Sequence, residues 1–63
     1  MFSIEWLGAR GERLSFDALD TAASRQEAEA QTIYLWNAKA KLLGAENVQL
    51  YENGTTEPFW TLR

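Results

Sequence analysis

The chain has 63 residues, nine acidic and six basic side chains for a net charge of −3, and neither cysteine nor histidine. Disulfides and thiolate metal sites are therefore excluded, the commonest transition-metal ligand is missing, and the charge does not suit binding to phosphate backbones. A chain this short buries only about 60% of the surface that its unfolded form exposes, so oligomerisation is the available stabilising device, and an unusually well-packed monomer core is the alternative. We expect one small domain over residues 1–63.

The first part of the chain predicts a β-hairpin. Residues 2–7 alternate between the two sides of the backbone, which is the pattern of a half-buried strand. A turn with two glycines follows, and residues 13–16 alternate again, with Leu14 and Phe16 on the apolar side. Residues 17–23 are then expected to connect this hairpin to a helix.

A single long helix is predicted next. Ser24 and Glu27 form the Ser-x-x-Glu capping pattern, and Asp20 is a competing cap about one turn earlier. The helix is therefore expected to start between residues 21 and 25 and to run to Leu43. Gly44 suits the left-handed backbone conformation that commonly ends a helix.

The predicted helix carries apolar residues on more than one side. At about 100° per residue, one face is expected to pack on the sheet, and Lys39 falls inside that face, where its ammonium group is expected to reach past the sheet edge into water. The residues expected on that face are Ala28, Ile33, Leu35, Trp36, Ala40, Leu42 and Leu43. The opposite side carries Ala30, Tyr34 and Ala38, which suit either a solvated surface or one on which another helix packs.

A second hairpin is predicted to close the chain. Val48, Leu50 and Tyr51 mark a strand, and Asn53-Gly54 favours a type I′ turn. Residues 59–62 are predicted to form a last strand; because Pro58 cannot donate to a ladder, this strand lies at an edge or begins just after the proline. The predicted fold is therefore α+β with the order ββαββ: a four-stranded, largely antiparallel sheet with one long helix packed on one face. This layout is similar to that of several groups of small bacterial and phage proteins of unknown function.

No pattern of catalytic residues is evident. Without histidine and cysteine, only carboxylates, lysines and hydroxyl groups remain, and turn formation and helix capping explain Asp17 and Asp20 better than acid–base catalysis does. Neither glycine-containing segment has the pattern of a phosphate-binding loop. We therefore expect no enzymatic activity, no cofactor and no metal site.

Two further classes of partner are also disfavoured. Nucleic acid would have to be attracted by Arg10, Arg13 and Arg63, and nine acidic side chains outweigh their positive charge. No apolar run approaches the length of a membrane span, and the N-terminal residues lack the pattern of a signal peptide. We expect a cytoplasmic protein of a bacterium or a phage.

The remaining apolar residues point to a protein partner. If strand alternation continues to the end of the chain, Trp60 and Leu62 lie with Tyr51 and Leu7 on the sheet face opposite the helix, where they form an apolar patch. Tyr34, on the back of the helix, is the competing interface residue. The sequence therefore predicts a protein-interaction or regulatory module that binds itself as a homodimer, another protein, or both. The alternative is a module that binds a small flat aromatic ligand through its three tryptophans.

Overall fold

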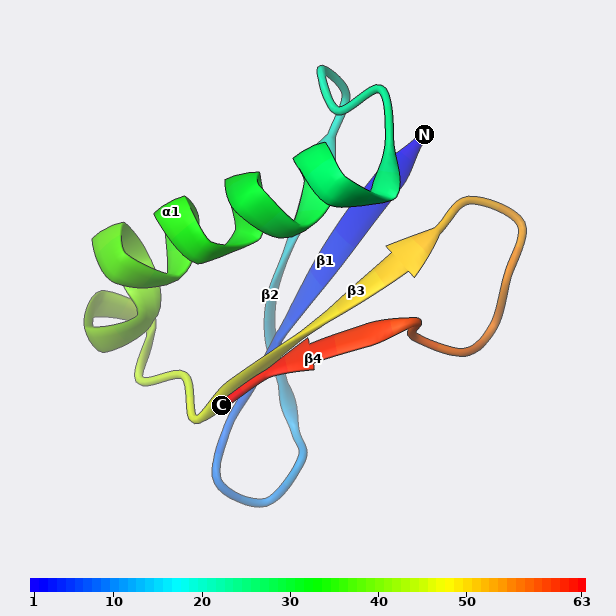
Figure 1. Cartoon of the computed structure of the whole chain (residues 1–63). Coiled ribbons are helices and arrows are strands. Elements are labelled where there is room, and N and C mark those ends of the chain that lie inside the picture. The colour runs from blue at the N-terminus through cyan, green and yellow to red at the C-terminus, as the bar shows by residue number, and fades with distance from the viewer.

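One helix lies across one face of a four-stranded antiparallel sheet (Figure 1). The computed structural model describes residues 1–63. Its elements in chain order are β1 (Phe2–Leu7), β2 (Arg13–Leu19), α1 (Arg25–Leu43), β3 (Asn47–Glu52) and β4 (Trp60–Leu62). In space the strands are ordered β2-β1-β3-β4, so the long strand β2 and the three-residue strand β4 form the two edges. The predicted α+β fold with the order ββαββ is confirmed.

Local signals set the ends of α1 as predicted. The Ser24 hydroxyl accepts a hydrogen bond from the Glu27 backbone N–H at 3.2 Å, and the helix begins at Arg25. Gly44 ends the helix with φ of 72°, a left-handed conformation that costs glycine little. The helix does not combine the length and the apolar composition that crossing a membrane requires.

Strand β2 runs three residues further than predicted. Phe2 at the start of β1 pairs with Leu19, so pairing continues through part of the segment that was expected to be a connection, residues 17–23. Leu19 is only 4% exposed, and its burial with Phe2 fixes the end of the strand. Asp17 therefore lies within a strand rather than in a loop.

A β-bulge near the first turn sets which side chains of β2 face the helix. Between the Trp6–Ser15 pair and the Leu7–Arg13 pair the register shifts by one residue, which leaves Leu14 without a partner of its own. Beyond the bulge, Ser15 shares the helix-facing side with Trp6. The expectation that Leu14 and Phe16 face the core is therefore wrong: they are 39% and 49% exposed.

The core fills the space between the sheet and α1. It is built from alternate residues of the two central strands, the end of β2, small residues of the helix, and one alanine from each of the connections that flank the helix. The buried apolar side chains are Phe2, Ile4, Trp6, Leu19, Ala22, Ala28, Ala40, Ala45, Val48 and Leu50. Thr32 is also fully buried, and its hydroxyl donates to the Ala28 carbonyl oxygen at 2.7 Å.

The predicted sheet-facing side of α1 is confirmed at its centre and wrong at its edges. Leu35, Trp36 and Leu43 pack against the core as expected. Leu42 and Ile33 are instead 86% and 45% exposed, because they lie roughly 80° and 100° around the helix from the fully buried Thr32, at the borders of the face that contacts the sheet.

The connection between β3 and β4 differs from the predicted type I′ turn. It spans residues 53–59, and the Thr55 N–H bonds to the Glu52 carbonyl oxygen at 3.1 Å. Only Gly54 has a positive φ, 89°, whereas a type I′ turn needs positive φ at Asn53 as well. The pattern is that of a type II turn, followed by four further residues before the short edge strand begins.

Candidate interaction surfaces

Two of the five predicted interface residues lie on the helix side of the sheet. Leu50 pairs with Trp60 and Val48 pairs with Leu62, and paired residues of antiparallel strands point to the same face. Leu50 and Val48 are fully buried, and Trp60 and Leu62 pack half-buried against the same core. The expectation that these two residues lie on the open face is therefore wrong.

The position of Phe59 explains the error. Alternation along residues 59–62 would place Phe59 and Trp60 on opposite faces, but Phe59 precedes β4 and escapes that constraint. Its N–H bonds to the Leu50 carbonyl oxygen, and its ring centroid lies 5.9 Å from that of Phe2 at the border of the core. Phe59 and Trp60 consequently both pack on the helix side of the sheet.

The open face of the sheet carries the other two predicted interface residues that lie in strands, Leu7 and Tyr51, and each is half-buried. The Tyr51 hydroxyl donates to the Gln49 side-chain oxygen at 2.9 Å and lies 3.2 Å from Glu5 Oε1. The Arg13 guanidinium pairs with the other carboxylate oxygen of Glu5 at 3.2 Å. A polar network therefore covers much of this face.

Phe16 is the main apolar side chain on the open face, and it belongs to the same network. The Arg13 guanidinium carbon lies 5.1 Å from the centre of the Phe16 ring. Burial first, and then the charge and hydrogen bond of Glu5, raise the pKa of the Tyr51 hydroxyl above its ordinary value, while the Arg13 charge opposes this change. This side of the sheet is polar enough to face water, as is common for an antiparallel sheet with one covered face.

A second polar cluster lies between β2 and α1. The fully buried Trp6 donates its indole N–H to Asp17 Oδ2 at 2.8 Å, and Lys39 Nζ lies 3.0 Å from the same oxygen. Lys39 also lies 5.7 Å from the Trp6 ring centre, so its ammonium group does not simply extend past the sheet edge as predicted. The tryptophan itself stacks on Trp36, with the ring centroids 6.2 Å apart.

Ionisation of Asp17 is set by opposing influences. Desolvation by burial is the largest and disfavours the charged form, but the hydrogen bonds from Lys39 and Trp6 and the Lys39 charge together outweigh it. The pKa of Asp17 is thereby held below its ordinary value. The resulting ion pair joins the sheet to the helix.

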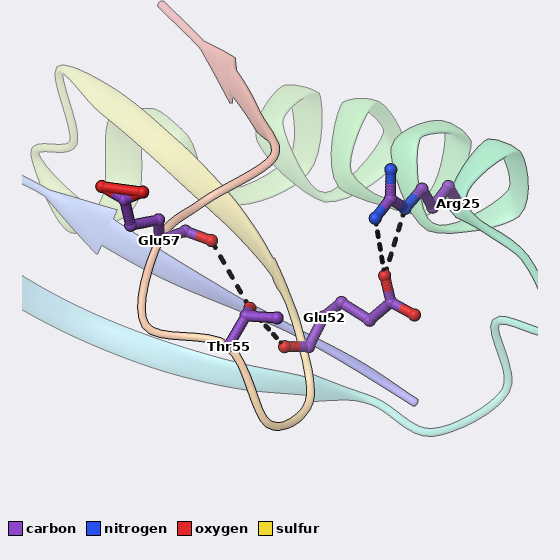
Figure 2. Close-up of polar contacts among 4 residues, drawn as sticks. All are labelled: Arg25, Glu52, Thr55 and Glu57. Carbon is purple, nitrogen blue, oxygen red and sulfur yellow. Dashed lines mark hydrogen bonds and ion pairs between the residues drawn. The ribbon is translucent and has the colours of Figure 1, made fainter.

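The third polar cluster ties the start of α1 to the loop after β3 (Figure 2). The Arg25 guanidinium donates twice to Glu52 Oε1, at 2.9 and 3.1 Å, and lies 4.7 Å from the Phe59 ring centre. The Thr55 hydroxyl donates to the Glu52 carbonyl oxygen at 2.6 Å and lies 3.4 Å from the Glu57 carbonyl oxygen. These groups satisfy one another and hold the loop against the helix.

The outer face of α1 differs from these three clusters, because its apolar side chains are not packed against other parts of the chain. Tyr34 is 74% exposed and its hydroxyl makes no hydrogen bond within the chain. Leu42 is 86% exposed, and Ala30 and Ala38 are also exposed. A shallow hollow beside Tyr34 is lined by Ala30, Gln31 and Leu35. Of the five predicted interface residues, Tyr34 is the one with the most exposed apolar surroundings.

The three tryptophans do not converge on a ligand pocket. Trp6 is fully buried, and none of the surface hollows is lined by more than one tryptophan. No buried side-chain nitrogen or oxygen lacks a hydrogen-bond partner, and no group of three acidic side chains could hold a metal ion. Binding of a flat aromatic ligand stays a prediction that no observed geometry favours.

Comparison with other proteins adds no assignment. The sequence matches no protein-family model, and no curated protein or solved structure is significantly similar to it.

Proposed function

We propose that this protein is a small non-enzymatic interaction module that self-associates through the outer face of α1. One observation carries the proposal: Tyr34 and Leu42 are 74% and 86% exposed on a helix face where no polar network covers them. Aromatic residues are enriched in the buried centres of protein interfaces. The chain is also short and has no disulfide, so association would add buried apolar surface that its own core does not supply.

The open sheet face is the weaker choice of interface. Its most exposed large apolar residue, Phe16, lies under the Arg13 guanidinium, and Glu5 and Tyr51 fill the neighbouring positions with paired polar groups. A partner docking there would have to displace or desolvate these pairs, which costs free energy.

Sedimentation velocity over a hundredfold range of concentration tests the proposal. The wild-type protein is expected to shift from monomer towards dimer as the concentration rises. Tyr34→Glu is expected to weaken association by about tenfold or more, since it puts a charge at the centre of the contact. Phe16→Glu is the matched control on the open face and should leave association unchanged. A wild-type protein that stays monomeric throughout the range would refute self-association.

A further inference from the structure

Five exposed residues form a stripe along the outside of α1: Glu27, Ala30, Tyr34, Ala38 and Lys41. Residues three, four and seven apart on an α-helix lie on the same side, so all five project in nearly one direction. That direction is opposite to Thr32, the fully buried residue at the centre of the sheet-facing side. Figure 1 shows that no other element lies over this side of the helix.

The stripe is symmetric about Tyr34. Ala30 and Ala38 lie four residues before and after it, and Glu27 and Lys41 lie seven residues before and after it. The two alanines therefore mirror one another in size, and the two outer residues mirror one another with opposite charge. Glu27 and Lys41 take part in none of the chain's ion pairs, which are Arg13–Glu5, Arg25–Glu52 and Lys39–Asp17.

Such a stripe is complementary to its own copy when two helices run antiparallel. A two-fold axis at Tyr34 places each Glu27 opposite Lys41 of the second copy and each Ala30 opposite Ala38 of the second copy. Alanines permit the close approach of the helix axes, about 8–10 Å in packed helix pairs. A parallel arrangement would instead set Glu27 against Glu27 and Lys41 against Lys41, so the charges select the antiparallel one.

We propose that a second copy of this chain docks on this stripe, with the two α1 helices antiparallel and the Tyr34 side chains meeting at the two-fold axis. The proposal rests on the self-association proposed above and adds the surface, the orientation and the pairs of residues. Such a contact is isologous, because the same patch is used on both copies. The dimer has four layers, with the two helices inside and the two sheets outside. One helix face per copy offers less than the roughly 800 Å² per partner of a standard interface, so we expect the dimer to dissociate on dilution.

Charge exchange at the ends of the stripe tests the orientation. Glu27→Lys and Lys41→Glu, made separately, each replace two attractive contacts with two repulsive ones and are expected to weaken the homodimer by about tenfold. Mixed in equal amounts, the two variants are expected to form a heterodimer in which every end contact joins opposite charges. The double variant Glu27→Lys/Lys41→Glu is expected to recover the wild-type dimer. Glu29→Lys is the control, since it reverses the same charge two residues along the helix and off the stripe.

The outcomes separate this inference from the proposed function. If the wild-type protein dimerises and the two single charge variants dimerise equally well, the antiparallel helix contact is overturned while self-association stands. If the wild-type protein is monomeric at every concentration, self-association itself fails and this contact fails with it. Recovery of the dimer on mixing supports the contact, and it shows at once that both variants are folded. Circular dichroism of each variant alone checks that a loss of dimer is not a loss of helix.

Discussion

Removal of the Asp17 carboxylate tests how the sheet and the helix are held together. In Asp17→Ala, the indole N–H of the fully buried Trp6 loses its acceptor, and Lys39 loses its ion-pair partner. A buried donor left without a partner costs about 1–3 kcal/mol. Since the side chains of Lys39 and Asp17 are 35% and 32% exposed, the ion pair itself adds only about 0–1 kcal/mol. We expect the free energy of unfolding to fall by about 1–4 kcal/mol, a large share of the roughly 3–9 kcal/mol expected for a domain of this size.

Urea unfolding followed by tryptophan fluorescence measures this change. Two further variants separate the contribution of the hydrogen bond from that of the charge and provide a control. Asp17→Asn keeps an oxygen that can accept from the Trp6 indole but removes the charge, so it is expected to cost about 1 kcal/mol or less. Asp20→Ala removes an exposed carboxylate that makes no side-chain hydrogen bond, and should change the free energy of unfolding by less than about 0.5 kcal/mol. If Asp17→Ala costs no more than Asp20→Ala, the indole–carboxylate hydrogen bond does not stabilise the fold.

The same carboxylate gives a pH dependence of known sign. The pKa of Asp17 is lower in the folded protein than in the unfolded chain, so the folded state binds the proton less tightly. The contribution of Asp17 to stability is therefore present above the ordinary aspartate pKa and is lost as the pH falls through and below about 4. A plot of unfolding free energy against pH should fall less steeply in Asp17→Asn than in the wild-type protein over that acidic range.

Three further changes test other parts of the fold. Ser24→Ala should lower the free energy of unfolding by about 1 kcal/mol in urea, because the Glu27 N–H loses its acceptor. Leu43→Ala should cost about 2 kcal/mol, whereas Leu42→Ala, at a side chain 86% exposed, should cost less than about 0.5 kcal/mol; equal costs would contradict the orientation of α1. Because the pKa of Tyr51 is raised on folding, stability should decline as the pH rises through and above about 10, and Tyr51→Phe should reduce that decline; a wild-type unfolding midpoint that is constant up to about pH 11 would argue against it.

The elements that the sequence predicts well are those fixed by near neighbours in the chain. The cap at Ser24 and the left-handed Gly44 are local devices, and both ends of α1 follow from them. Strand β1 is likewise predicted to the residue, because its alternation is uninterrupted and one of its faces is fully buried. For these elements the tertiary structure agrees with the local preference.

Strand β2 shows what local pattern cannot supply. Its side chains alternate between two faces, and from the sequence the face that carries Leu14 and Phe16 is the more apolar of the two. The structure buries the other face, which includes Leu19 and Asp17, because the pairing with β1 sets the register. An aspartate on the inner face is tolerated only because Lys39, 22 residues away in the chain, meets it there. The residues of the strand alone do not predict this partner.

The lysine on the apolar side of the helix was nevertheless a usable signal. A charge at the centre of a buried face requires a partner, and the helix wheel places Lys39 beside Trp36 on the side that packs on the sheet. Of the acidic residues of the hairpin, Glu5 alternates with the buried Trp6 and so points to the open face, and Glu12 lies in the turn, which leaves Asp17. If Lys39 is paired within the protein and does not extend into water, Asp17 is predicted on the inner face of the sheet and Phe16 on the outer face.

The two outer layers of the molecule differ in how they meet water, and this difference bears on association. On the open face of the sheet, Glu5 contacts both Arg13 and Tyr51, so the chain itself supplies partners for these polar groups. The helix buries Ala28, Thr32 and Ala40 and leaves the side chains of Tyr34 and Leu42 largely exposed to solvent. A substitution at either of these two positions removes no intramolecular packing of consequence, because both side chains are largely exposed. The back of α1 is therefore the place where a single change is expected to alter the association state while leaving the fold intact.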